Sequence, residues 1–139
     1  MPELTRVVLC VEDDADDREM ISNTIYEIDP SFKVVHAQNG IEAIEYLSKA
    51  KLSDDLPCLV ILDLNMPKMD GRKTLAEIKK DEQLSVLPVV ILSTSGNSID
   101  KLYCTNYGVE FITKPTDLLG IHYEIKRLLQ YCGNTETYH

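Results

Sequence analysis

The chain has 139 residues, about the size of one domain, since a typical domain has about 100 to 200 residues. Its 14 basic and 23 acidic residues give a formal net charge of −9, so bulk charge disfavours binding to nucleic acid or to an anionic membrane. A hydrophobic fraction of 44% excludes a disordered acidic tail. We expect a single domain over residues 1–139, with a core at about 6–131, a frayed tail at 133–139 and no room for a second output domain.

The sequence carries no targeting or membrane-spanning signal. Its longest aliphatic runs, such as Leu59 to Leu62, are far shorter than the roughly 20 residues of a membrane helix. The N-terminal segment lacks the basic and apolar regions of a secretory signal, so we expect a cytoplasmic protein. Disulfides are rare in that compartment. The four scattered cysteines are therefore expected to be thiols without a metal or redox role, with Cys10 and Cys58 as small buried side chains.

In chain order, five short apolar segments alternate with segments of helical periodicity. The apolar segments are Val7 to Val11, Phe32 to His36, Leu59 to Leu62, Val89 to Leu92 and Glu110 to Thr113. Helical spacing is seen at Ile41, Ile44 and Leu47, at Leu75 and Ile78, and at Ile121, Ile125 and Leu128. Apolar runs without polar alternation are typical of strands that are covered on both faces. The pattern predicts an α/β fold, a doubly wound sheet of five parallel strands flanked by five helices.

Turn residues agree with these elements. Asn39-Gly40 precedes the second helix, and Asp70-Gly71, after Met66-Pro67, leads into the third. Gly108 is expected to cap the end of the fourth helix. Residues 49–57 are predicted to form a polar connection.

Polar side chains follow four of the five predicted strands, at the edge where a doubly wound sheet binds its ligands. These residues are Glu12, Asp13, Asp14, Asp16 and Asp17 after the first strand, Asp63 and Asn65 after the third, Ser93, Thr94 and Ser95 after the fourth, and Lys114-Pro115 after the fifth. We interpret Asp14, Asp16 and Asp17 as a solvated first helical turn. Glu12 and Asp13 are expected beside Asp63, where clustered carboxylates need a cation and hard oxygen ligands select Mg²⁺.

Asp63 ends the most apolar strand of the chain, where a carboxylate is rarely a packing choice. It is either a metal ligand or a nucleophile, and both roles are compatible with a neighbouring Mg²⁺ and a lysine. Ser93 alone would be a turn or cap hydroxyl, and Lys114 alone a surface lysine. Their joint position at two strand ends favours a function for both.

The ordered set of motifs resembles the receiver domain of response regulators. The matching segments are Val11-Glu12-Asp13 with Arg18, Leu62-Asp63-Leu64-Asn65-Met66-Pro67-Lys68-Met69-Asp70-Gly71, Pro88-Val89-Val90-Ile91-Leu92-Ser93 and Phe111-Ile112-Thr113-Lys114-Pro115. The resemblance runs from about Arg6 to Leu129. It implies a flavodoxin-like strand order 2-1-3-4-5 and a chemotaxis-regulator-like response regulator of a two-component phosphorelay. Such a protein is not an enzyme, apart from self-phosphorylation from a phosphodonor and slow self-dephosphorylation.

The resemblance also implies the roles of the strand-end residues. Asp63 is the phosphoacceptor, Ser93 the switch hydroxyl that binds the phosphoryl group, and Lys114 the partner of a phosphoryl oxygen. Mg²⁺ or Mn²⁺ is bound by Asp63, Asp13, the backbone carbonyl of Asn65 and, through water, Glu12. Phe111 is the switch aromatic, and Pro115 follows a cis peptide bond. The signal leaves through the fourth helix, fifth strand and fifth helix, at residues 99–107, 110–113 and 117–131.

The implied partners are a sensor histidine kinase or phosphotransfer protein and a downstream protein target, with no nucleic acid and no membrane. The protein is expected to be a monomer or a phosphorylation-dependent homodimer. The sequence departs from the commonest family pattern at Ser93, where Thr is more frequent, at the bulky Thr94, and at Phe111, which is often Tyr. The long connection at residues 49–57 resembles regulators that partner phytochrome-type kinases.

Three other readings are weaker. A flavin-binding electron carrier needs a phosphate cradle rich in glycine and hydroxyls, but the loop after the first strand has five acids in six positions and would repel phosphate. A hydrolase with an aspartate nucleophile needs a carboxylate two residues after Asp63, where this chain has Asn65. The intact site argues against an inactive receiver that serves only as an interaction module.

Overall fold

The computed structural model describes residues 6–66, 69–94 and 97–133. Pro67, Lys68, Ser95 and the predicted tail after Gly133 therefore lie outside the described residues. Strands and helices alternate along the chain as β1 (Val7–Val11), α1 (Ala15–Ile28), β2 (Lys33–Ala37), α2 (Gly40–Leu52), β3 (Leu59–Leu62), α3 (Gly71–Lys80), β4 (Val89–Ser93), α4 (Ser98–Asn106), β5 (Glu110–Thr113) and α5 (Leu118–Leu128). Short 3₁₀ helices lie at Leu84–Val86 and Leu129–Cys132.

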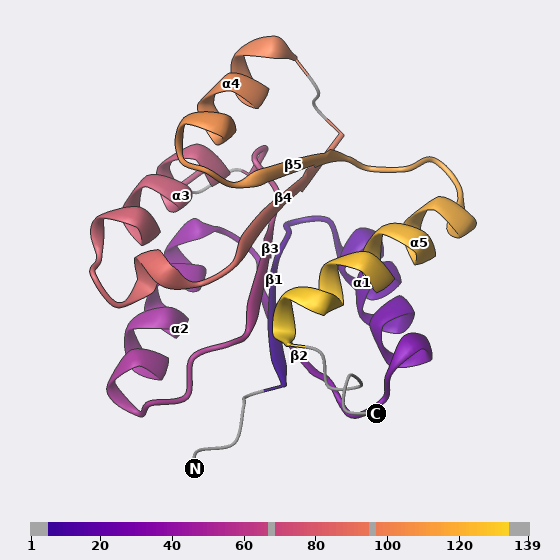
Figure 1. Ribbon diagram of the computed structural model, residues 1–139, viewed down its shortest axis with the longest axis horizontal. Helices are drawn as coiled ribbons and strands as arrows, with labels where there is room; N and C mark the ends of the chain where they lie inside the picture. The colour runs from indigo at the N-terminus through magenta and orange to yellow at the C-terminus, as the bar shows by residue number, and fades with distance from the viewer. Residues whose placement is uncertain (1–5, 67–68, 95–96, 134–139) are drawn as a thin grey trace.

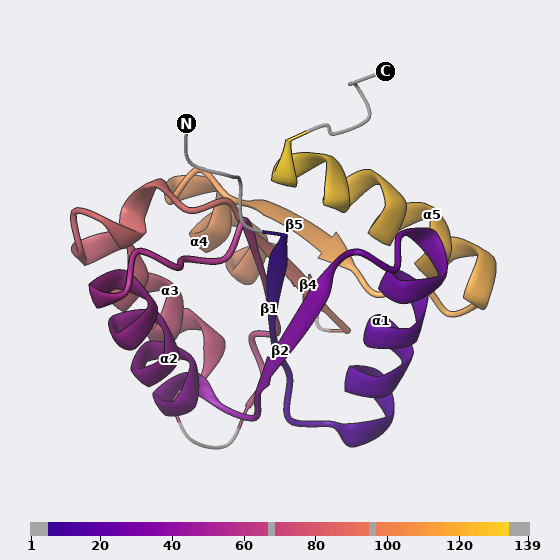
Figure 2. The same ribbon diagram turned by 90° about the horizontal axis from the view of Figure 1, so that it is seen from below.

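The five strands form one parallel sheet in the order β2-β1-β3-β4-β5, which confirms the predicted fold. Helices α1 and α5 cover one face of the sheet, and α2, α3 and α4 cover the other (Figures 1 and 2). Each face buries its own apolar cluster, because successive strand residues point to opposite faces. In β1, for example, Leu9 and Val11 pack toward α2 and α3, whereas Val8 and Cys10 pack toward α1 and α5.

Strands β1, β3 and β5 have the predicted bounds. Strand β2 begins at Lys33, one residue later than predicted, because Lys33 pairs with Val7 in the sheet. Strand β4 includes Ser93, so this hydroxyl lies within the sheet and not after it. Helix α2 continues to Leu52 and takes up the first part of the predicted connection at 49–57.

Helix ends follow the predicted turn residues. The Asn39 side chain accepts a hydrogen bond from the Glu42 amide at the start of α2, and Asp70 accepts one from the Lys73 amide at the start of α3. Both are N-caps, which satisfy amides that have no partner within the helix. Gly108 follows α4 with a φ of 71°, the left-handed conformation expected for a glycine at this position.

One expectation about the cysteines is wrong. Cys58 and Cys132 form a disulfide with a Cα–Cα distance of 4.9 Å, which joins the start of β3 to the 3₁₀ helix after α5. The expectation of free thiols assumed a reducing compartment. The two cysteines are 74 positions apart in the sequence, and only the fold brings them together. Cys10 and Cys104 are buried free thiols, and burial raises the pKa of Cys10 to about 12, with a further contribution from the charge of Glu12. No helix in the described part of the chain is long and apolar enough to cross a membrane.

Candidate functional site

The parallel sheet brings the predicted site residues to one edge. Beyond β1 and β3 the ladder continues with the Asp63 amide, which donates to the Val11 carbonyl at 3.0 Å. Beyond β5, the Lys114 amide donates to the Ser93 carbonyl at 2.9 Å. Because parallel strands share a carboxyl edge, residues from four distant parts of the sequence meet there.

Three carboxylates form the centre of the site. Glu12, Asp13 and Asp63 each present an oxygen, and these oxygens all lie within 4.8 Å of one another. Glu12 and Asp63 are buried, whereas Asp13 is exposed. Burial, together with the charge of Asp63, raises the pKa of Glu12 to about 7 against the opposing effect of the hydrogen bond from Lys114.

Lys114 neutralises part of this charge. Its Nζ donates to Glu12 Oε1 at 2.6 Å and to Asp17 Oδ2 at 2.7 Å, and its side chain is 8% exposed. Burial alone would lower the pKa of Lys114, but the hydrogen bonds to Asp17 and Glu12 outweigh it and raise the pKa. The reading of Asp17 as a solvated helix residue is therefore wrong. Asp17 lies in the first turn of α1, and the fold places Lys114, which is far away in the sequence, within hydrogen-bond distance of its carboxylate.

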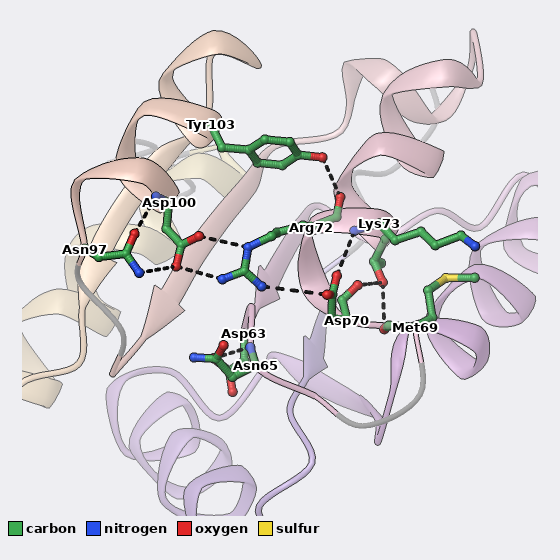
Figure 3. A network of polar contacts seen from close by, with 10 residues as sticks. Asp63, Asn65, Met69, Asp70, Arg72, Lys73, Asn97, Asp100 and Tyr103 are labelled. Atoms are coloured by element: carbon green, nitrogen blue, oxygen red, sulfur yellow. Dashed lines mark hydrogen bonds and ion pairs between the residues drawn. The ribbon is translucent and has the colours of Figure 1, made fainter.

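The backbone around the acidic cluster is held by side chains. Arg18 Nη1 donates to the carbonyls of Glu12 and Asp13 at 3.0 and 3.1 Å. The Asn65 amide lies 3.4 Å from Asp63 Oδ1, and Figure 3 shows these two residues side by side. Arg18 thus fixes the loop that carries the acidic pair.

Ser93 and Phe111 lie on the same face of the sheet. Ser93 is fully buried at the end of β4, two residues after Ile91, and Phe111 pairs with Ile91 across the ladder. Phe111 is half-buried and packs against the apolar cluster of the α2, α3 and α4 side. The hydroxyl and the ring therefore face the same layer of helices.

The expectation of a cis peptide bond before Pro115 is wrong. The described residues contain no cis peptide bond, so Lys114–Pro115 is trans. The trans isomer is the more stable form of an X–Pro bond by about 0.5–1 kcal/mol. The Lys114 amide keeps its ladder hydrogen bond in this arrangement.

The donor set fits a hard divalent cation. Three carboxylates within reach of one another, one exposed and two buried, offer the oxygen ligands that Mg²⁺ and Mn²⁺ prefer. The carboxylates of the cluster outnumber the two positively charged side chains beside it, Lys114 and Arg18. A cation would relieve the repulsion between Asp63 and Glu12 that raises the Glu12 pKa.

Known proteins with a similar sequence include response regulators. A family model described as the response regulator receiver domain matches residues 8–126. Response regulator Rcp1 of Synechocystis sp. is 33% identical over 135 residues, which cover 95% of this chain and 92% of Rcp1.

Solved structures with the same fold include two regulators of phytochrome systems. The phosphorylated cyanobacterial phytochrome response regulator RcpA has a TM-score of 0.84 and 34% identity, over 94% of this chain and 96% of RcpA. The Mn²⁺-bound form of Rcp1 has a TM-score of 0.81 and 29% identity, over 94% of this chain and 96% of Rcp1. The bacteriophytochrome response regulator AtBRR has a TM-score of 0.73 and 32% identity, over 91% of this chain and 94% of AtBRR.

Proposed function

This chain belongs to the response-regulator receiver family, and we propose that its Asp63 carboxylate accepts the phosphoryl group. Receiver domains act in two-component signalling, receive phosphoryl groups from histidine kinases and bind Mg²⁺ or Mn²⁺. They are signalling modules and not enzymes of metabolism. The observation that carries the assignment of Asp63 is the convergence of three carboxylates and one buried lysine at the carboxyl edge of the sheet.

The transfer itself asks little covalent chemistry of the protein. An Asp63 oxygen attacks the phosphorus of a phosphohistidine, so an O–P bond forms as the P–N bond breaks. The imidazole nitrogen leaves with the electron pair of that bond and takes a proton from solvent. Catalysis is then positioning together with neutralisation of the charge on the moving group. The same attack on a small acyl phosphate accounts for self-phosphorylation.

Asp13, Asp63 and the backbone carbonyl of Asn65 would hold the metal ion directly, and Glu12 would hold it through water. When bound, the ion supplies positive charge to the phosphoryl oxygens. Lys114 exchanges its contacts with Glu12 and Asp17 for a phosphoryl oxygen. Ser93 donates its hydroxyl to another oxygen of the phosphoryl group.

The test is labelling of the purified chain. We expect intact-mass spectrometry to show one phosphoryl group after incubation with acetyl phosphate or a phosphohistidine donor, and only with a divalent cation. Peptide mapping should place it on Asp63, and Asp63→Asn should abolish it. Asp16→Asn is the matched control, because Asp16 is an exposed acid of the same run. Undiminished labelling of Asp63→Asn would overturn the assignment.

We further propose that the signal leaves through α4, β5 and α5, with Phe111 as the rotor. Ser93 and Phe111 face the same helix layer, so movement of the hydroxyl toward the phosphoryl group vacates space into which the ring turns. Amide-resolved NMR with beryllofluoride and Mg²⁺ tests this route. Shifts should reach residues 99–113 and disappear there in Ser93→Ala. Shifts confined to the surroundings of Glu12, Asp63 and Lys114 would exclude it.

A phytochrome-class histidine kinase is the partner that we propose. RcpA and AtBRR are phytochrome regulators by name, and this chain has a long connection before β3, as expected for such regulators. A phosphotransfer profile against kinases of several classes tests the assignment. The phytochrome-class kinase should transfer fastest; faster transfer from a chemotaxis-class kinase would overturn it.

A further inference from the structure

The helices α3 and α4, which follow the strand ends at the acidic edge, are joined by an ion pair. One loop runs from Asp63 to α3, and the second runs from Ser93 to α4. Arg72 is the second residue of α3, and Asp100 is the third residue of α4. The Arg72 guanidinium donates to both carboxylate oxygens of Asp100. The distances are 2.8 Å from Nε to Oδ1 and 2.7 Å from Nη2 to Oδ2. Figure 3 shows the Arg72 guanidinium between the two helices.

The bridge is part of a wider polar contact between α3 and α4. The Asp100 side chain is 4% exposed, and the Arg72 side chain is 33% exposed. Asn97, the N-cap of α4, accepts from the Asp100 amide at 2.8 Å and donates to Asp100 Oδ2 at 3.2 Å. One turn further, the Tyr103 hydroxyl donates to the Arg72 carbonyl at 2.9 Å. A bidentate, charge-assisted pair of this kind fixes orientation as well as distance.

Helix α4 buries a small apolar face, formed by Cys104 with Tyr103 packed against the same cluster. Of its nine residues, all of which the structure describes, Asp100 and Cys104 are buried. Its large apolar side chains Ile99 and Leu102 are 79% and 62% exposed. Helices in proteins are held mainly by burial of an apolar face, and this face of α4 is small, so its polar contacts with Arg72 contribute to its position.

The other end of the bridge is fixed to Asp63. The Gly71 amide donates to the Leu64 carbonyl at 2.9 Å, and a Cβ added at Gly71 would lie 2.1 Å from the Asp63 carbonyl oxygen. The start of α3 therefore cannot shift without the Asp63 backbone. At the start of α4, Asp100 lies only seven positions after Ser93 in the sequence. The bridge thus couples the two sides of the site.

We propose that Arg72 and Asp100 form a latch that holds α4, the helix that follows Ser93 in the chain, in the position of the unphosphorylated protein. They are positioning residues, since neither touches the reacting atoms. The proposal rests on the function proposed above, because it takes Asp63 as the phosphoacceptor. A phosphoryl group favours the state in which Ser93 has moved, and the latch opposes that state. Loss of the latch therefore raises the apparent affinity for a phosphoryl group.

The test compares Arg72→Ala, Asp100→Asn and the double variant in the full chain. NMR titration measures the affinity for beryllofluoride with saturating Mg²⁺, and intact mass measures the acetyl phosphate concentration at half-maximal labelling. We expect each single variant to bind beryllofluoride about threefold or more tightly. The double variant should gain no more than either single variant, because both changes break one bridge.

The direction of the effect separates the latch from simple electrostatics. If Arg72 and Asp100 acted only as charges near the site, removal of the cation would weaken binding of the anionic analogue and removal of the carboxylate would strengthen it. A latch shifts both variants the same way. Opposite shifts, or wild-type affinity in both variants, would overturn the proposal.

Lys51→Ala is the matched control. Lys51 Nζ binds Asp81 Oδ2 at 2.6 Å and ties α2 to the far end of α3. This variant should lose thermal stability while its beryllofluoride affinity stays unchanged; a gain equal to that of Arg72→Ala would assign the effect to general loosening and overturn the latch.

Arg72→Lys covers the case in which the larger truncations unfold, since it keeps one ion pair and loses the bidentate geometry. Its affinity should lie above the wild-type value, and wild-type affinity in this variant would count against the latch. Asp63→Asn separates the two proposals. Labelling that survives Asp63→Asn refutes the phosphoacceptor, whereas Asp63-dependent labelling with wild-type affinity in Arg72→Lys refutes only the latch.

Discussion

At the scale of single residues, Lys114 connects the resting site to the proposed chemistry. Its ammonium already lies between Glu12 and Asp17, so the positive charge needed for a phosphoryl oxygen is in place before the group arrives. Because Lys114 and Glu12 are both buried, their pairing is strong in the low local dielectric. In the function that we propose, phosphorylation would exchange the partners of Lys114, and a metal ion held at the acidic cluster would supply positive charge beside Glu12.

The first prediction concerns Asp13. Mg²⁺ binds the folded site and not the unfolded chain, so it should raise the melting temperature. At a concentration of 100 times its Kd, it should raise the free energy of unfolding by about 2.7 kcal/mol. Asp13→Ala removes one of three clustered carboxylates and relieves repulsion. The metal-free variant should melt at or above wild type and lose most of the shift with Mg²⁺. Differential scanning calorimetry measures both, and a variant that keeps the full shift would place the metal elsewhere.

At the scale of elements, the chain is closely packed at Gly71, where α3 begins beside the Asp63 backbone. We predict that Gly71→Ala lowers the free energy of unfolding by about 1–3 kcal/mol, because the new methyl group would meet the Asp63 carbonyl. It should also slow labelling of Asp63. Gly108→Ala is the contrast, since among the described residues no atom outside its chain neighbours lies within 4 Å of its added Cβ, and its left-handed φ opposes the change. Urea unfolding and labelling rates check both, and equal labelling in both variants would contradict the argument.

A surface pair between β5 and α5 predicts a pH dependence. Arg127 Nη2 binds Glu110 Oε2 at 2.6 Å, and this hydrogen bond, with one from Tyr131, lowers the pKa of Glu110. A lowered carboxyl pKa stabilises the fold above the unfolded value of about 4.5, and this stability is lost as the pH falls through the folded value. Arg127→Met should therefore cost up to about 1 kcal/mol at pH 7 and progressively less below pH 4.5. Urea unfolding across pH 3–7 checks this, and a constant difference would contradict it.

Sequence patterns predicted the bounds of three strands. Those of β1 and β3 agree because each is an apolar run between polar neighbours, and an apolar run without alternation has one favourable place, the centre of a covered sheet. The bounds of the edge strand β5 agree as well, although only Ile112 of its four residues is buried. The predicted end of α2 is too early, because nothing in the sequence distinguishes the last residues of the helix, Lys51 and Leu52, from the polar loop that follows them. Helix ends depend on local hydrogen bonds that periodicity does not report.

At the scale of the whole molecule, pairs of distant residues were beyond sequence reasoning. Glu12, Asp63 and Lys114 could be brought together because strand ends of a parallel sheet share an edge. Arg72 and Asp100 lie on helices, whose relative rotation depends on packing, so no pattern predicted their bridge. Compartment and spacing suggested free thiols at Cys58 and Cys132, and only the fold brings them together.

The last prediction concerns this disulfide. A cross-link between residues 74 positions apart restricts the unfolded chain, which by the chain-entropy relation stabilises the fold by about 4.5 kcal/mol. Cys58→Ser should lower the unfolding free energy by up to that amount in oxidising buffer and by much less with a thiol reductant present. Urea unfolding in both buffers measures the difference. Equal losses in the two buffers would mean that Cys58 contributes through packing alone.

The same bond divides the chain by covalent connectivity. Residues 58–132 form a closed ring that holds Asp63, Ser93 and Lys114, while Glu12 and Asp13 lie on the open arm before it. A single backbone cut inside the ring therefore leaves both fragments joined, and they separate only after reduction. A cut between α2 and Cys58 detaches the arm with the acidic pair under any redox condition. The site is thus assembled from two pieces of chain that only noncovalent contacts and the connection before β3 hold together.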